Sequence, residues 1–189
     1  MTNRISLSAS PSLLSRLTAA YSRRRFGTAI DPVLAMAHHG GVLRAYAVFE
    51  SLVERWDVLP ARLRTLAVMA AAHRLRCSWC TDFGYWIAVS DGIDEATVAD
   101  VPSWRDSARF SPLERSVMAY AEAICGEPEE VEDAMVAGLR EELGEPGLVE
   151  LTMIVAVENQ RARFNRSLGL TSQGFADRCA VRNAGVPGR

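Results

Sequence analysis

The spacing of the apolar residues constrains the fold of this chain more than any other feature. Apolar side chains recur every three or four residues through most of the sequence, as on one face of an α-helix. Residues 13–21, 43–53 and 63–70 each show this pattern. No window sustains the alternation of apolar and polar residues that is typical of a β-strand. The sequence therefore predicts an all-α fold, a helical bundle.

Capping residues mark where several of these helices begin and end. Ser10 and Pro11 predict the start of the first helix, and Gly27 predicts its end. The run Ser111-Pro112-Leu113-Glu114 has the pattern of a capping box with proline in the first turn. Pro146-Gly147 separates a helix that ends near Gly144 from a longer one that begins after it.

The same signals suggest three segments. We expect residues 1–30 to form an N-terminal helical extension and residues 31–170 to form the main helical domain. Residues 171–189 are polar and contain several glycines, so we expect a loose C-terminal tail.

Composition excludes several classes of function. All 21 basic residues are arginine, so neither a Schiff-base lysine nor a P-loop lysine is available. The formal net charge of −2 disfavours nucleic acid as the main partner, because phosphate binding needs a basic face. No apolar run approaches the roughly 18 residues of a membrane span, and the first residues do not resemble a secretory signal. We therefore expect a cytoplasmic protein with no membrane partner.

Two of the four cysteines form the motif Cys77-Ser78-Trp79-Cys80 between two predicted helices. In a reducing compartment such a pair suggests redox chemistry or a metal site rather than a structural staple. A zinc site needs further ligands at suitable spacing, which the remaining cysteines and three histidines do not supply, so we expect no metal and no other cofactor.

The spacing of Cys77 and Cys80 brings both sulfurs to one side of a helical turn, close enough for a disulfide. A helix that begins here favours a thiolate, and the preceding Arg74 and Arg76 add positive charge. One thiolate then attacks an oxidant or a disulfide, and the other thiol resolves the product. The alternative is that both cysteines are small buried residues in a packing seam.

A longer polar pattern lies in the last helix of the main domain. Glu158 and Arg161 share one helical face, and Asn165 follows within the same polar stretch. This stretch predicts either a buried contact that fixes helix register or subunit packing, or a solvated face.

The segment RLRTLAVMAAAHRLRCSWCTDFGYWIAVSDGI, together with FSPLERSVMAYAEAIC and GLVELTMIVAVENQRARFNRSLGL, resembles the carboxymuconolactone decarboxylase and alkylhydroperoxidase D-like superfamily. The resemblance covers roughly residues 30 to 170. It implies an alkylhydroperoxidase D-like helical fold and a homo-oligomer, from dimer through trimer to hexamer. For members with thiols it implies an antioxidant peroxidase that a dithiol reductant recycles. On this basis Cys80 attacks and Cys77 resolves.

The family's peroxidases also use a glutamate twelve residues before the first cysteine and a histidine four residues after the second. This sequence has Thr65 and Gly84 at those positions. Asp82 and His73 are the candidate replacements for this proton relay. The structural alternatives are that Asp82 satisfies free backbone N–H groups and that His73 lies at the surface.

The sequence thus supports a thiol-dependent oxidoreductase that takes a small-molecule oxidant, a hydroperoxide or a disulfide, and a dithiol reductant. A second hypothesis is a non-redox binding or structural protein with the same fold, which the two missing relay residues favour. A third is a cofactor-free lyase, similar to carboxymuconolactone decarboxylase, or a hydrolase, acting on a small organic acid.

Overall fold

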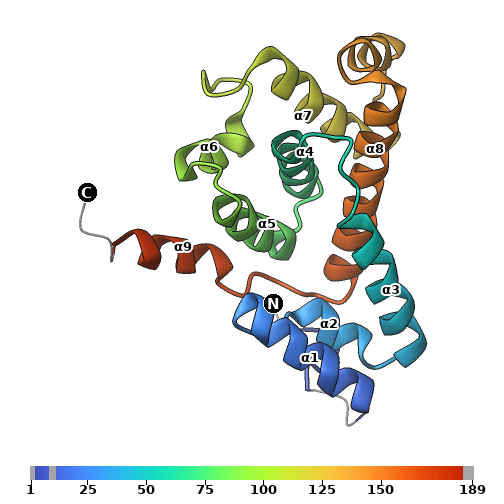
Figure 1. The fold of residues 1–189 in the computed structure, drawn as a ribbon, viewed down its shortest axis with the longest axis vertical. Helices are drawn as coiled ribbons and strands as arrows, with labels where there is room; N and C mark the ends of the chain where they lie inside the picture. Colours follow the sequence, from blue (N-terminus) through green and yellow to red (C-terminus); the bar gives the residue numbers. More distant parts are fainter. Residues whose placement is uncertain (1–2, 9–11, 185–189) are drawn as a thin grey trace.

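The computed structural model describes residues 3–8 and 12–184, and within them every regular element is helical (Figure 1). This confirms the predicted all-α class. The elements are α1 (Leu13–Phe26), α2 (Asp31–Met36), α3 (Gly40–Val53), α4 (Ala61–Arg74), α5 (Ser78–Ser90), α6 (Glu95–Asp100), a 3₁₀ turn (Val101–Ser103), α7 (Pro112–Ile124), α8 (Asp133–Ser167) and α9 (Phe175–Ala184).

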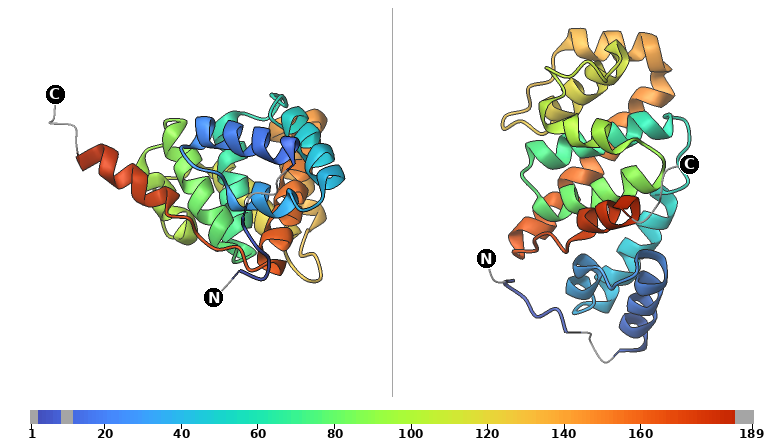
Figure 2. Two further views of the ribbon diagram at one scale, coloured as in Figure 1. Left: turned by 90° about the horizontal axis from the view of Figure 1, so that it is seen from below. Right: turned by 90° about the vertical axis from the view of Figure 1, so that its left-hand side faces the viewer.

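Helix α4 lies at the centre of the main bundle and packs against α5, α7 and α8 (Figures 1 and 2). Its inward side chains are mostly small: Ala67, Ala71 and Ala72 are completely buried. Small side chains let neighbouring helices approach closely, so α4 can be surrounded on several sides. This packing fixes α5 and α8, the two helices that carry the candidate site.

The expected caps are found in part. Gly27 ends α1 in the left-handed conformation, and Ser111 and Glu114 form the predicted capping box of α7. Ser10 and Pro11 lie outside the described residues, and the side chain that caps α1 is that of Ser12. The expected break after Leu143 is a sharp bend within α8, at Gly144 with a φ of 68°.

The C-terminal segment differs from the loose tail expected for residues 171–189, as far as residue 184. Residues 175–184 form α9, which packs on α5. Phe175 is fully buried and its ring meets those of Phe83 and Trp86 on α5. The polar composition of the segment does not predict this order, because only one buried aromatic ring and a few hydrogen bonds hold the segment on α5.

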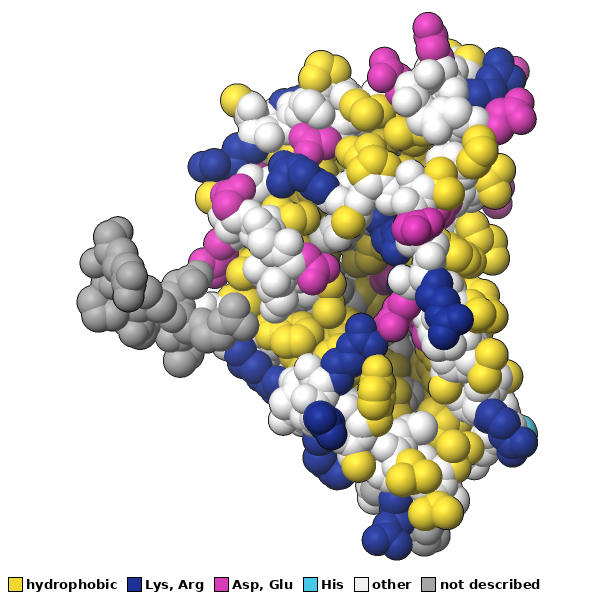
Figure 3. All heavy atoms as spheres, in the orientation of Figure 1, with side chains coloured by type: hydrophobic (Ala, Val, Ile, Leu, Met, Phe, Trp, Pro, Cys, Tyr) yellow, Lys and Arg dark blue, Asp and Glu magenta, His cyan; other side chains and the backbone are white. Residues whose placement is uncertain are grey.

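Several apolar side chains remain exposed on the described surface. Most of them lie on α1, α3 and α8, among them Val48, Leu52 and Val149. Figure 3 shows that one face of the molecule is hollowed between α5 and α8, with apolar and charged side chains around the hollow. None of the described helices combines the length and the apolar character that a membrane span requires.

Candidate dithiol site

The cysteine pair lies where α4 ends and α5 begins, with almost no loop between them. The N–H of Arg76 bonds to the carbonyl of His73, and the N–H of Cys77 bonds to that of Ala72. This is the Schellman arrangement of a helix C-terminus, which needs a residue with positive φ. Arg76 supplies it with a φ of 53°, at a position where glycine is usual. The turn places Cys77 directly at the start of α5.

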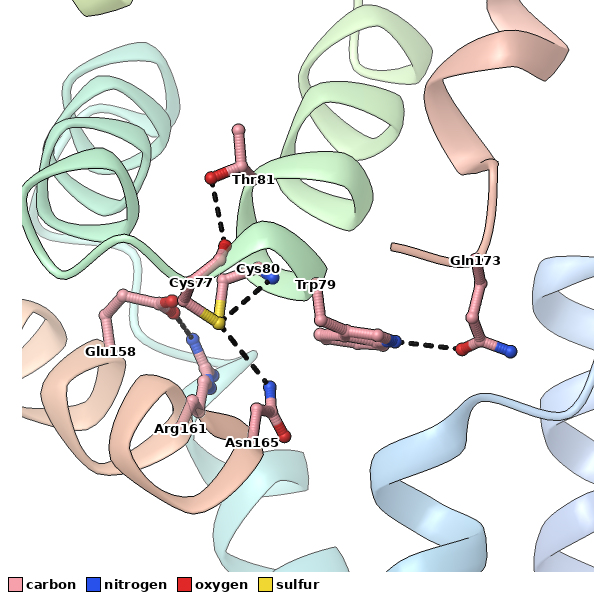
Figure 4. The surroundings of a disulfide bond; sticks show 8 residues. All are labelled: Cys77, Trp79, Cys80, Thr81, Glu158, Arg161, Asn165 and Gln173. Carbon is pink, nitrogen blue, oxygen red and sulfur yellow. Dashed lines mark hydrogen bonds and ion pairs between the residues drawn. A yellow bond between two sulfur atoms is a disulfide. The ribbon is translucent and has the colours of Figure 1, made fainter. Parts of the chain in front are cut away.

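Cys77 is the N-cap of α5, and its sulfur accepts a hydrogen bond from the backbone N–H of Cys80 at 3.2 Å. The two sulfurs form a disulfide, with their Cα atoms 5.2 Å apart (Figure 4). Cys77 is 0% exposed and Cys80 is 6% exposed. The pair therefore lies at the positive end of a helix dipole and is shielded from bulk water, as the sequence predicted for the helix terminus.

A buried amide from α8 completes the surroundings of the sulfurs. Nδ2 of Asn165 lies 3.5 Å from Sγ of Cys80 and 4.0 Å from Sγ of Cys77. Asn165 is only 2% exposed, so its amide is directed inward at the pair. An N–H donor at this place stabilises negative charge on sulfur, and it lies nearer to Cys80.

Two turns earlier on α8, Glu158 is 3% exposed and its carboxylate is turned toward the pair (Figure 4). Oε2 of Glu158 lies 3.4 Å from Nη1 of Arg161, whereas Oε1 is buried with no hydrogen-bond partner. Arg161 makes its stronger contacts with Glu50 of α3, at 2.9 Å and 2.5 Å. Of the two alternatives that the sequence left open for the polar stretch of α8, the structure therefore shows the buried contact, and not a solvated face, at Glu158 and Asn165.

The two carboxylates around Arg161 titrate differently. Burial raises the pKa of Glu158 to about 7, and Arg161 offsets only part of this effect. Burial would also raise the pKa of Glu50, but its paired hydrogen bonds with Arg161 bring that pKa below its usual value. Near neutral pH, Glu50 is therefore the ionised partner of Arg161, and Glu158 exchanges a proton.

The positions of the family's relay residues are filled by other groups. Thr65 is a half-buried residue of α4, and Gly84 lies where α5 passes close to Met69 of α4. A Cβ atom at Gly84 would lie 2.6 Å from Sδ of Met69. The space that a histidine would need is therefore occupied by the methionine side chain.

The two candidate replacements interact with groups other than the cysteine pair. The carboxylate of Asp82 accepts hydrogen bonds from the backbone N–H groups of Gln173, Phe175 and Ala176, which ties α9 to α5. Burial would raise the pKa of Asp82, but these hydrogen bonds bring it below its usual value. His73 is half-buried, its pKa is lowered by burial, and the charge that acts on it is that of Glu122 on α7. The alternative structural role suggested for Asp82 is the one that its contacts support.

The remaining thiols lie apart from the pair. Burial raises the pKa of Cys125 to about 11, although Asn159 donates a hydrogen bond to its sulfur at 3.2 Å. Cys179 is buried within α9. Within residues 3–8 and 12–184, no three His, Cys, Asp or Glu side chains are grouped so that they could hold a metal ion.

The model of the carboxymuconolactone decarboxylase family matches residues 41–123. The chain is also 30% identical to the uncharacterized protein YnjA of Escherichia coli strain K12 over an aligned region of 165 residues. This region covers 86% of this chain and 90% of YnjA. The chain belongs to the carboxymuconolactone decarboxylase family. This confirms the family resemblance of the sequence.

Several solved structures are similar to the chain in fold. A peroxidase-related protein of Ralstonia eutropha JMP134, described as an alkylhydroperoxidase AhpD core, is 20% identical with a TM-score of 0.77, over 93% of each chain. A peroxidase-related protein of Silicibacter sp. TM1040 is 13% identical with a TM-score of 0.80, over 92% of this chain and 94% of that one. A Cys-to-Ala variant of the debrominase Bmp8, in complex with 2,3,4-tribromopyrrole, is 16% identical with a TM-score of 0.79, over 95% of each chain. These likenesses establish the alkylhydroperoxidase D-like fold.

Proposed function

We propose that this protein is a thiol-dependent oxidoreductase in which Cys80 attacks a hydroperoxide and Cys77 resolves the product. The observation that carries the proposal is the placement of two bonded sulfurs at the N-terminus of α5, with a buried amide N–H directed at them. A helix N-terminus and a hydrogen-bond donor both favour the thiolate, which is the reactive form.

The surroundings also support the division of roles between the two cysteines. Cys80 keeps some exposure and lies nearer to the Asn165 amide, whereas Cys77 is fully buried. An attacking thiol has to meet a substrate, but a resolving thiol has to meet only its partner. The cycle ends when a dithiol reductant opens the disulfide by thiol exchange.

The same reasoning extends to the assembly. We expect a homo-oligomer, because apolar side chains on α1, α3 and α8 stay exposed in the single chain. The small-molecule oxidant and the dithiol reductant are then the other partners of the protein.

The test is the rate of alkylation by iodoacetamide against pH, measured on the reduced wild type and on the Cys77→Ser and Cys80→Ser variants. We expect a reactive thiol whose rate midpoint lies below the ordinary value of about 8.5 and disappears in Cys80→Ser. Slow alkylation of both thiols, with a midpoint near that value, would favour the non-redox alternative. An activity on a small organic acid that survives in Cys80→Ser would favour the lyase.

A further inference from the structure

We propose that Glu158 is the acid–base residue of the dithiol site, moving one proton between the attacking thiol and the oxygen that leaves. This inference rests on the proposed peroxidase chemistry of Cys77 and Cys80. It gives a proton-transfer group to a site in which Thr65 and Gly84 stand at the relay positions of the related peroxidases.

The placement of Glu158 on α8 is the first support. Glu158 and Asn165 are seven residues apart, which is two helical turns, so they lie on the same face of the helix. Asn165 meets the sulfurs from that face. Figure 4 shows the Glu158 carboxylate and the Asn165 amide turned toward the cysteine pair from the same helix.

The unsatisfied oxygen of Glu158 is the second support. Its Oε1 atom is buried and has no hydrogen-bond partner, although buried polar atoms in folded proteins nearly always have one. A carboxyl oxygen with a free acceptor site, turned toward the cysteine pair as in Figure 4, is placed to take a proton from a thiol of the reduced pair. A purely structural glutamate would be expected to have both oxygens bonded, as Glu150 does with Arg64 and the N–H of Val58.

The contrast between Glu158 and Glu50 is the third support. Both carboxylates meet Arg161, but Glu50 makes two short bonds and Glu158 makes one long contact. Such an asymmetric pair separates a carboxylate that stays ionised from one that exchanges a proton near neutral pH. Arg161 holds Glu158 in place without fixing its charge.

Charged and titratable groups on α8, α3, α5 and α7 surround Glu158. They are Arg161 on α8, Glu50 on α3, the cysteine pair at the start of α5, and Cys125 at the end of α7. Tyr46 on α3 interacts with Glu50 and Arg161. Arg161 stays charged, and the pKa of Tyr46 is raised above its ordinary value, mainly by burial. The pKa of Cys125 is raised to about 11, so among these residues Glu158, with a pKa of about 7, is the one that exchanges a proton near neutral pH.

The reaction balances with this assignment. The Cys80 thiol gives its proton to the Glu158 carboxylate, and the thiolate attacks the outer oxygen of ROOH. The O–O bond breaks, the S–O bond forms, and the leaving RO⁻ takes the proton from Glu158, giving ROH and a sulfenic acid. The Cys77 thiol then displaces water from the sulfenic acid to form the disulfide, and the reductant restores both thiols while it is itself oxidised to a disulfide.

The test compares the rate constants of the reduced protein with cumene hydroperoxide and with iodoacetamide across a pH series. The variants are Glu158→Gln, Glu158→Asp and the matched control Glu150→Gln, another buried glutamate of α8. The active state holds one proton between thiol and carboxyl, so the wild-type peroxide profile should be bell-shaped. Glu158→Gln should lower the peroxide rate about 100-fold and remove the bell shape. Glu158→Asp should retain part of the peroxide rate and of the bell shape, and Glu150→Gln should keep the wild-type pH profile.

Iodoacetamide isolates the delivery of a proton to the leaving oxygen, because alkylation also needs the thiolate but its leaving iodide takes no proton. At the alkaline end of the pH series, where the thiol ionises without a base, alkylation in Glu158→Gln should therefore stay within a few-fold of wild type. An equal loss of both rates at that pH would mean that the variant disturbs the thiols, and an unchanged bell-shaped peroxide profile would mean that Glu158 moves no proton. Either result overturns the inference but not the proposed function. A wild-type protein whose Cys80 ignores hydroperoxides would overturn the proposed function itself.

Discussion

Replacing Glu158 by glutamine should change the pH dependence of stability in a direction opposite to that of an ordinary buried ion pair. Burial raises the pKa of Glu158 from 4.5 to about 7 in the folded protein, with Arg161 offsetting part of the effect. In the unfolded chain the carboxyl loses its proton near its ordinary value of about 4.3. Between these pH values the folded state holds a proton that the unfolded state has released, so stability falls as the pH rises.

The size of this effect follows from the two pKa values. At about 1.4 kcal/mol for each pH unit, the wild type loses about 3 kcal/mol between pH 4.5 and pH 8 through this one group. Glutamine has the same shape and no proton to lose. The free energy of unfolding of Glu158→Gln, relative to wild type, should therefore rise by about 3 kcal/mol over that range.

Urea unfolding of the reduced proteins, followed by circular dichroism at constant protein concentration, measures this difference. Glu150→Gln is the control, because Glu150 pairs with Arg64 at 2.5 Å and accepts the N–H of Val58 at 2.9 Å. That variant should lose about 1 to 3 kcal/mol near neutral pH, since it leaves a partly buried arginine without its charge partner. Curves for wild type and Glu158→Gln that stay parallel from pH 4.5 to 8 would refute the reasoning about Glu158.

Three further predictions concern the surroundings of the pair. Gly84→Ala should destabilise the protein by about 1 to 3 kcal/mol in thermal melts, because the new Cβ meets buried Met69; an unchanged melting temperature would show that Met69 yields freely. Asp82→Asn should speed hydrogen exchange in residues 173–184, and the stability that the Asp82 carboxylate adds should be lost as the pH falls through its lowered pKa; unchanged exchange would contradict the anchoring role. Cys125 should resist iodoacetamide at pH 8 in the native reduced protein and react after denaturation, because burial raises its pKa to about 11; fast native labelling would contradict this.

Much of the fold was predictable because local signals agree with the packing. The capping box at Ser111 and Glu114 and the glycine stop at Gly27 each depend on a few neighbouring residues, which a sequence displays directly. The order of residues 171–184 was not predictable in this way. It depends on Asp82 and the aromatic rings of α5, which are about ninety residues away in the sequence.

The site was predictable to a similar degree. The cysteine spacing and the helix terminus indicated where the thiols lie, since both are local features. The partners of the pair come from α8, some eighty residues later, so no spacing rule linked them to the cysteines. The sequence signal for Glu158 and Asn165 was a polar face on an otherwise apolar helix. The structure shows that both side chains are buried, which makes them candidate functional residues. Asp82 and His73 lie close to the cysteines in the sequence, but the Asp82 carboxylate bonds to the start of α9, and the charge that acts on His73 is that of Glu122.

The most direct test of the central claim is the reaction of the reduced protein with one equivalent of an organic hydroperoxide, followed by intact mass analysis after alkylation. We predict that two thiols are lost per peroxide consumed, that they are Cys77 and Cys80, and that a dithiol restores both. In Cys77→Ser the reaction should stop at a sulfenic acid on Cys80. Peroxide consumption no faster than that of free cysteine, or an equal rate in Cys80→Ser, would contradict the account.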